Sequence, residues 1–278
     1  MVLVQILRWL VSDTYIALLF TLATVLVASI IIWRNLQSAR SQREETDNYI
    51  PNLPIPEDVD HVPLVYTRHS VDEMRRRAKD FYALMQKRRT VRFFSDEDVP
   101  VDVVDEIVRT AGTSPSGAHK QPWTFVVVRN RETKRRIREI VEREEEINYA
   151  RRMGSAWVDA LKPLQTTWEK PYLETAPCVV LVFKQVYGLE SSGARQNFYY
   201  QEISVSIACG FLIAAIHNAG LVTVTHTPLN AGGALRDLLD RPPNEKLLMM
   251  LPIGYPADDA TVPDLERKEL EEILVRID

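Results

Sequence analysis

The sequence is poor in the residues that build disulfide frameworks and metal centres. Its 278 residues include only two cysteines and five histidines. Cys178 and Cys209 each lie inside an apolar run, so we expect buried free thiols, as in a domain that occupies a reducing compartment. The histidines lie far apart, and no pair has the helical spacing of metal ligands. We therefore predict no metal site.

Common signatures of nucleotide and nucleic-acid binding are also missing. The sequence has no G-x-G-x-x-G motif for a nicotinamide dinucleotide, no Walker loop and no H-E-x-x-H zinc motif. No nucleophile elbow supports a Ser/His/Asp triad. The formal net charge is -4, and the basic residues are spread along the chain, which argues against a nucleic-acid partner. The length then suits one globular domain with an appendage.

The appendage is an uncharged apolar run at residues 15–33. At a helical rise of 1.5 Å per residue the run covers about 28 Å, close to the thickness of a bilayer's hydrocarbon core. Tyr15 and Trp33 stand where interfacial aromatic residues are common. A cleaved signal peptide is the alternative, but the run is long and no clear cleavage site follows it. We predict a single-pass transmembrane helix after a short N-terminal segment, residues 1–14.

Basic residues around this run favour a cytosolic location for the rest of the chain. Four arginines flank the run: Arg8 precedes it, and Arg34, Arg40 and Arg43 follow it. The excess places the C-terminal side in the cytosol, at the plasma membrane or a vesicle membrane. Residues 34–63 are polar and then proline-rich, and we interpret them as a juxtamembrane linker.

Residues 64–278 show helix and strand signals in irregular alternation. Ser70 begins a capping box and predicts a helix to about Lys87. Pro100 predicts the start of a second helix, which stops at Gly112. Apolar, β-branched segments predict buried strands at residues 123–128, 176–183, 222–225 and 247–254. This order predicts an α+β fold in which helices flank a mixed sheet.

Two longer segments need separate interpretation. Residues 198–219 are apolar nearly all round and resemble a second membrane span, but their serines and Gly210 favour a central core helix. Residues 131–153 are highly charged, which is typical of a surface helix that can act as a lid. Glu145 and Tyr149 share one face of that helix. From the sequence alone, Glu145 is most simply one more exposed carboxylate.

Two polar segments are candidates for a ligand site. Arg88-Arg89-Thr90-Val91-Arg92 places three guanidiniums within five residues, and arginine forks match phosphate oxygens. Ser114-Pro115-Ser116-Gly117-Ala118-His119 is a turn of small residues, which leaves backbone N–H groups open to a flat polar ligand. Together they suggest a phosphorylated cofactor. On composition alone, a solvated run of arginines explains the first segment equally well.

Together with Gln121-Pro122-Trp123, these two segments resemble the FMN-binding signature of the nitroreductase superfamily. From about Asp58 to the C-terminus the chain is similar to the iodotyrosine deiodinase family within it. Four stretches carry that similarity: residues 145–149, 202–210, 227–230 and 260–265. The resemblance implies a nitroreductase-like FMN-binding fold, an intertwined homodimer with FMN at the subunit interface, and an N-terminal membrane segment.

The resemblance also implies which residues hold the cofactor. They are Arg88, Arg89, Thr90, Val91, Arg92, Pro115, Ser116, Thr225, His226, Thr227 and Arg267. The Thr227 hydroxyl would donate to flavin N5 and so support one-electron steps. His226 stands where the resemblance leads us to expect threonine. Its side chain either alters the flavin contacts or points away from them.

The substrate that the resemblance implies is a halogenated tyrosine, chiefly 3-iodo-L-tyrosine and 3,5-diiodo-L-tyrosine. Glu145 would accept from its ammonium group, Lys170 would pair with its carboxylate, and Tyr149 would hydrogen-bond the zwitterion. The backbone N–H of Ala118 would bind the phenolate oxygen. Ala118 and Thr227 are thus the predicted catalytic positions, and a closing lid would exclude water.

The implied reaction is reductive dehalogenation, in which a halotyrosine takes up two electrons and a proton and gives tyrosine and halide. The electrons would come from NADPH through a separate reductase, since the sequence shows no nicotinamide site. A generic NAD(P)H-dependent nitroreductase or quinone reductase is the alternative, and it would not need Glu145, Tyr149 and Lys170. A membrane-tethered flavin or halotyrosine binding protein is a non-enzymatic alternative.

Overall fold

The computed structural model describes residues 24–34, 59–190 and 193–277. By internal contacts the chain divides into two units, residues 1–50 and 51–278. In the first unit, residues 24–34 form a helix with exposed side chains. The rest of the predicted span, the segment before it and most of the predicted linker lie outside the described residues. Within the described ranges, no helix is both long and apolar enough to cross a membrane.

The second unit is built on a four-stranded sheet with the order β1-β2-β6-β5, in which neighbouring strands are antiparallel. The strands are β1 (Trp123–Val128), β2 (Cys178–Gln185), β5 (Val222–Thr223) and β6 (Glu245–Gly254). The bounds of β1 are those predicted from the sequence. The four strands therefore pair only in the antiparallel sense, and the predicted mixed character rests on one isolated parallel bridge between Thr90 and Thr223 at the β5 edge.

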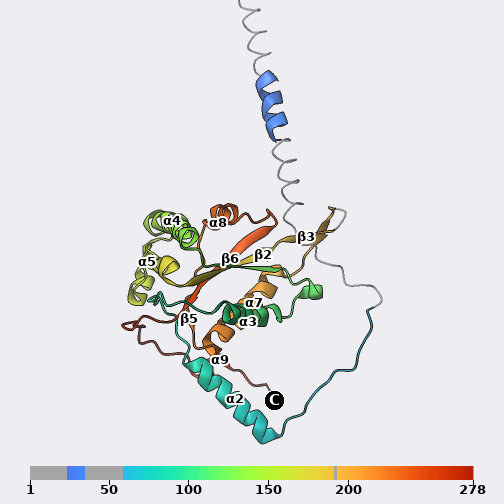
Figure 1. Ribbon diagram of the computed structural model, residues 1–278, viewed down its shortest axis with the longest axis vertical. Helices are drawn as coiled ribbons and strands as arrows, with labels where there is room; N and C mark the ends of the chain where they lie inside the picture. Colours follow the sequence, from blue (N-terminus) through green and yellow to red (C-terminus); the bar gives the residue numbers. More distant parts are fainter. Residues whose placement is uncertain (1–23, 35–58, 191–192, 278) are drawn as a thin grey trace, which may run out of the picture. The chain divides into compact units, whose positions relative to one another are not determined.

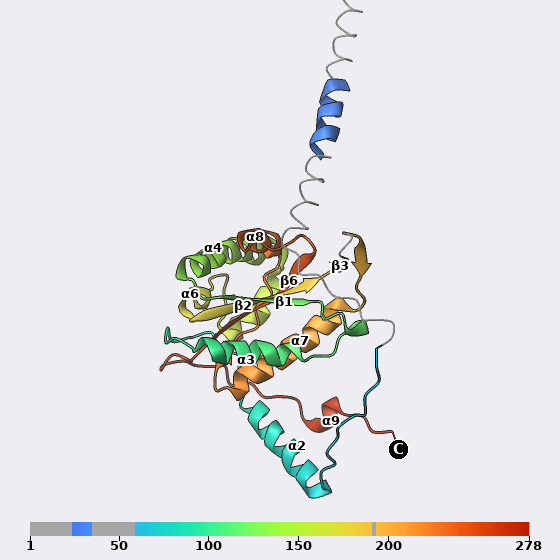
Figure 2. The ribbon, with the colours of Figure 1, turned by 45° about the vertical axis from the view of Figure 1, so that its right-hand side comes forward.

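Helices cover both faces of this sheet, as Figures 1 and 2 show. The long ones are α3 (Val101–Gly112), α4 (Arg131–Ile147) and α7 (Gln201–Asn218). Shorter helical elements are η1 (Gly117–His119), η2 (Asn148–Arg152), α5 (Ser155–Leu161), η3 (Lys162–Leu164), α6 (Tyr172–Thr175), α8 (Gly232–Leu238) and α9 (Leu270–Ile273). A separate two-stranded sheet joins β3 (Tyr187–Leu189) to β4 (Arg195–Asn197).

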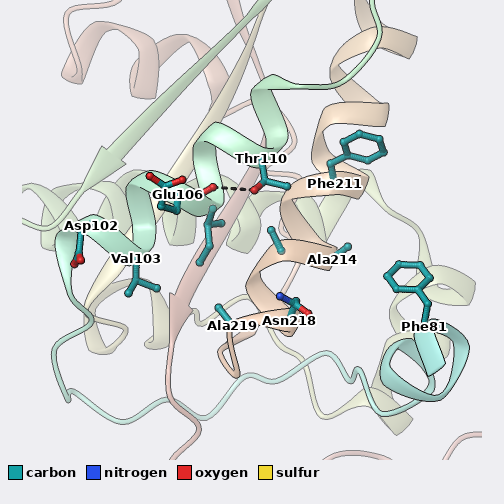
Figure 3. Close-up of a pocket in the computed structure, with 11 residues that line it drawn as sticks. Phe81, Asp102, Val103, Glu106, Thr110, Phe211, Ala214, Asn218 and Ala219 are labelled. Atoms are coloured by element: carbon teal, nitrogen blue, oxygen red, sulfur yellow. Dashed lines mark hydrogen bonds between the residues drawn. The ribbon is translucent and has the colours of Figure 1, made fainter. Parts of the chain in front are cut away.

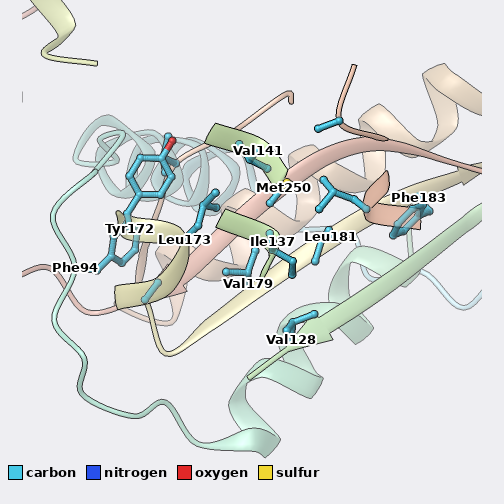
Figure 4. Packing of buried hydrophobic residues seen from close by; sticks show 14 residues of the cluster. Phe94, Val128, Ile137, Val141, Tyr172, Leu173, Val179, Leu181, Phe183 and Met250 are labelled. Carbon is cyan, nitrogen blue, oxygen red and sulfur yellow. The ribbon is translucent and has the colours of Figure 1, made fainter. Parts of the chain in front are cut away.

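The central strand β2 supplies side chains to two cores because successive residues of a strand face opposite ways. Leu181 and Phe183 pack with Ile137 of α4 in the core that Figure 4 shows. Val180 and Val182 pack on the other face with residues of α3 and α7. A strand that is buried on both faces needs an unbroken apolar run, and the sequence of β2 provides one.

Helix α7 confirms the prediction of a core helix rather than a second membrane span. Val205 and Leu212 are buried in the second core, whereas Ile207 and Phe211 are exposed. The helix is therefore apolar all round, although only part of its surface is covered within the chain. Cys178 and Cys209 are free thiols as expected, and burial raises the pKa of each to about 11.

Helix α2 (Val71–Gln86) begins where the sequence predicts. The Ser70 hydroxyl oxygen accepts from the backbone N–H of Glu73 at 3.3 Å, which satisfies one donor of the first turn. None of the residues of α2 is buried, and Phe81 in its apolar stripe is 59% exposed. Its end is held by the His217 ring, which lies 2.8 Å from the carbonyl oxygen of Leu84.

Candidate functional site

The arginine segment that follows α2 lies against the C-terminal part of the chain. The Arg267 guanidinium donates to the carbonyl oxygens of Gln86 at 3.1 Å and Arg88 at 2.7 Å. Arg89 donates to the carbonyl oxygen of Pro263. Burial, together with the positive charges of Arg267 and Arg89, lowers the pKa of Arg88. Three guanidiniums thus repel one another at one place, and a phosphate dianion would relieve that repulsion.

Thr90 and Val91 are fixed along the edge of the sheet. The backbone N–H of Val91 donates to the carbonyl oxygen of Thr223 at 3.1 Å, beside the Thr90 bridge. Arg88, Arg89 and Val91 line a cavity of about 220 Å³ against the C-terminal end of α7 and strand β5. The segment therefore combines a rigid backbone with a cationic pocket, which suits the phosphate end of FMN.

The chain after β5 alternates between exposed and buried side chains. Thr225 and Thr227 are exposed, and His226 between them is buried. The ring Nδ1 of His226 lies 3.0 Å from the Tyr172 hydroxyl, so the side chain points into the core and away from the face of the two threonines. Burial and the positive charges of Lys170 and Arg92 lower the pKa of His226 to about 3, so its ring is neutral.

Glu145, Tyr149 and Lys170 come together at one point. The Lys170 ammonium lies 4.0 Å from a carboxylate oxygen of Glu145 and 5.3 Å from the centre of the Tyr149 ring. Glu145 is only 8% exposed, so it is not one more surface carboxylate. Burial lowers the pKa of Lys170 to about 8, with Glu145 opposing the shift and Arg92 adding to it. A buried carboxylate beside a buried ammonium matches the two charges of an amino-acid zwitterion.

The position of Glu145 follows from the pattern of α4. Lys134, Ile137, Val141 and Glu145 recur at helical spacing and form its buried stripe. At its end α4 widens into the π-helical turn η2, a distortion that often occurs at functional sites. Asn148 continues the stripe into η2 and is fully buried. The sequence interpretation gave Asn148 no role, although the same spacing could have identified it.

The turn of small residues has an unusual backbone. Ala118 and His119 have φ angles of 48° and 52°, in the left-handed region. The Gly117 N–H donates to the Ser204 hydroxyl of α7 at 3.4 Å, and the Ser116 hydroxyl accepts from the Gln121 N–H at 2.9 Å. The first bond holds the turn against the N-terminal end of α7, and the second closes the turn itself.

The predicted site residues therefore form two groups within one chain. Ser204 holds the turn of Ala118, and His217 lines the cavity of the arginines. His217 follows Ser204 by thirteen positions in the helix, which corresponds to a rise of about 20 Å. Arg92 connects the arginine segment to the Glu145 group, because its charge acts on Tyr149 and Lys170. Pro115, Ser116 and Ala118 lie at the other end of α7.

The fold agrees with comparisons with known proteins. Residues 85–255 match the nitroreductase family, and the chain belongs to that family. The mouse protein iodotyrosine deiodinase 1 is 50% identical, over 93% of this chain and all of its own length. The zebrafish iodotyrosine deiodinase is 60% identical, over 80% of this chain and 75% of its own length.

A solved structure of an iodotyrosine deiodinase also matches this chain. Oxidized iodotyrosine deiodinase bound to FMN and 3-iodo-L-tyrosine is 32% identical, with a TM-score of 0.62. The match covers 71% of this chain and 98% of the solved chain. Within the nitroreductase family, the chain is therefore one of the iodotyrosine deiodinases.

Proposed function

We propose that this chain is an FMN-dependent enzyme that reductively deiodinates 3-iodo-L-tyrosine and 3,5-diiodo-L-tyrosine to tyrosine and iodide. The observation that carries the proposal is the buried pair of Glu145 and Lys170 beside the Tyr149 ring. A quinone or nitroaromatic compound carries no zwitterion, so a generic nitroreductase has no use for this pair. The names of the mouse and zebrafish relatives, and the two ligands of the solved relative, support the same substrate class.

The residues present fit FMN. Arg88, Arg89 and Arg267 would bind the phosphate, and Thr90, Val91 and Arg92 would lie along the ribityl chain and the ring. Thr225 and Thr227 share an exposed face, and the Thr227 hydroxyl would donate to flavin N5; His226 would contribute through its backbone. Pro115 and Ser116 would line the ring system from the second group. FMN would supply the electrons for carbon–iodine cleavage, one at a time.

The protein's own groups bind and orient the substrate. Glu145 would accept from the ammonium group, Lys170 would pair with the carboxylate, and Tyr149 would hydrogen-bond the zwitterion. The Ala118 N–H would donate to the phenolate oxygen, which selects the ionised ring. Because both charged ends are then desolvated, binding would exclude water from the ring. Two electrons and one proton convert the halotyrosine to tyrosine and halide, and the electrons would come from NADPH through a separate reductase.

The site needs a second copy of the chain, and we infer a homodimer. The turn of Ala118 contacts Ser204, whereas the arginine cavity lies at His217, about 20 Å farther along α7 of the same chain. A groove of about 480 Å³ also runs between α2, α3 and α7, with Phe81 and Phe211 at its edges (Figure 3). A helix as exposed as α2 gains most of its stability from packing, which the partner would supply. Sedimentation velocity tests this, because a monomer with tightly bound FMN would contradict it.

We also propose that the apolar run at residues 15–33 anchors the enzyme in a membrane, with the catalytic domain in the cytosol. The support is the length of the run and the arginines that follow it. Fractionation of cells that express the full chain, with carbonate and detergent extraction, tests the anchor. Release by carbonate alone would contradict it.

The decisive experiment is an anaerobic titration of the purified enzyme. The flavin is reduced with dithionite, 3-iodo-L-tyrosine is added, and the flavin spectrum and free iodide are followed. We expect reoxidation with stoichiometric release of iodide. A flavin that stays reduced with halotyrosine, but reoxidises with a quinone, would favour the generic reductase.

The variant Glu145→Gln separates the two activities. It removes the charge that binds the ammonium group, and the loss of a charged hydrogen bond should lower kcat/KM for 3-iodo-L-tyrosine by roughly a hundredfold. Reduction of a nitroaromatic compound should be unchanged. Glu146→Gln is the matched control, because Glu146 is an exposed neighbour on the same helix. Equal halotyrosine activity in the two variants would exclude this site.

A further inference from the structure

Asn148 uses every hydrogen-bonding position of its side-chain amide. Its Nδ2 donates to Glu145 Oε1 at 3.2 Å and to the carbonyl oxygen of Leu229 at 3.1 Å. Its Oδ1 accepts from Arg152 Nη1 at 3.0 Å and from Asn230 Nδ2 at 3.3 Å. A primary amide has two N–H donors and two lone pairs, so the group is saturated. It is also fully buried.

These bonds join two segments that are far apart in the sequence. One is the end of α4, where Glu145 would bind the substrate's ammonium group. The other is the loop at residues 227–230, which begins with the Thr227 that would face flavin N5. The Asn148 bonds to Leu229 and Asn230 cross between them.

We propose that Asn148 is a positioning residue that couples ligand binding at Glu145 to the placement of the Thr227 loop. The inference rests on the proposed function and adds to it a route between the substrate and the flavin edge. Glu145 offers one carboxylate oxygen to Asn148, and its other oxygen lies near Lys170. An ammonium group bound at this carboxylate therefore acts on a group that Asn148 already holds.

Saturation and burial make this link stiff. If Glu145 moves when it binds a ligand, Asn148 must follow or leave a buried donor unpaired, which is costly away from water. If Asn148 follows Glu145, its amide moves relative to Leu229 and Asn230, and their loop is displaced as well. Coupling between two binding equilibria is reciprocal, so the state of the flavin edge should also change the affinity for the amino acid.

The test compares variants of the FMN-loaded enzyme. Halotyrosine affinity is measured by titration with 3-iodo-L-tyrosine, and coupling is measured as the shift in flavin reduction potential that the ligand causes. In Asn148→Ala we expect affinity to fall by roughly tenfold to a hundredfold and the ligand-induced shift to disappear. Asn130→Ala is the matched control, because Asn130 caps the opposite end of α4 by accepting from Thr133 at 2.9 Å. It should keep both quantities, and FMN affinity should be unchanged in both variants.

A second variant avoids the buried position. Asn230 is exposed and has a φ angle of 69°, so Asn230→Gly removes its amide at a backbone position that glycine tolerates. It should reduce the ligand-induced shift while leaving the Asn148 bond to Glu145 intact, so affinity should fall by less than in Asn148→Ala. This variant decides the question if Asn148→Ala does not fold.

The outcomes separate the two proposals. A wild-type enzyme that does not bind 3-iodo-L-tyrosine refutes the proposed function. A wild type that binds it without a shift in potential refutes the coupling alone. The coupling is also refuted if Asn148→Ala or Asn230→Gly retains the full shift, since Asn148 would then only stabilise the fold.

Discussion

The buried His226 should make the protein sensitive to mild acid. Its pKa is 6.5 in the unfolded chain and about 3 in the folded one. Between these values the unfolded state binds more protons, so the free energy of unfolding falls as the pH decreases from about 6.5 toward 3. At pH 5 the difference corresponds to about 2 kcal/mol, and at pH 7.5 it is close to zero.

The variant His226→Asn isolates this effect. Asparagine can replace the Nδ1 contact to the Tyr172 hydroxyl but does not titrate. Urea unfolding at pH 7.5 and pH 5, at fixed protein concentration and with excess FMN, gives the loss in free energy of unfolding between the two pH values for the wild type and the variant. We expect the loss to be about 2 kcal/mol smaller in His226→Asn than in the wild type.

A matched control is His61→Asn, because His61 is exposed and lies in an irregular segment before α2. It should lose as much stability as the wild type over the same pH range. If His226→Asn also behaves like the wild type, the ring is not held neutral in the core, and the inference from its burial is wrong.

Two further predictions concern the substrate group and the packing of the sheet. The pKa of Lys170 is about 8, so kcat/KM for 3-iodo-L-tyrosine should fall as the pH rises above that value. Arginine stays charged, so the pH profile of Lys170→Arg should lack this decrease. An unchanged decrease in Lys170→Arg would assign it to another group. In Gly254→Ala the new Cβ would lie 2.6 Å from Cδ of Pro177, which should lower the free energy of unfolding by about 1–3 kcal/mol in urea. Gly233→Ala is its control because no atom beyond the backbone of its own helix and its chain neighbours lies within 4 Å of that Cβ, and equal losses would contradict the packing argument.

Much of the fold could be predicted because its signals are local. Trp123 to Val128 is an unbroken run of strand-forming residues, and Ser70 and Pro100 mark helix starts through their own chemistry. The strand ends at β2 and β5 were less accurate, because pairing with β6 decides where a ladder stops. The burial of Glu145 could not be predicted from residue type. Charged residues occupy both ends of the α4 stripe, so the helix appears more exposed in the sequence than it is.

The separation of the predicted site residues into two groups could not be predicted, because the two segments lie close together in the sequence. Only about twenty residues separate the arginine segment from the turn of small residues, so the residues alone do not show that one chain places them apart. Helix α3 lies between them and carries the chain away, so the turn meets the far end of α7. The number of residues between two segments does not show in which direction the chain runs between them. The direction of α3 depends on its packing with α7 in the second core.

In a homodimer each chain would supply the arginine half of one site and the Ala118 half of the other. A chain defective in one half and a chain defective in the other would then complement each other when they assemble. The mixed dimer has one site with both defects and one site with neither. Two inactive alleles could therefore restore about half of the activity per mixed dimer, whereas two alleles that damage the same half could not.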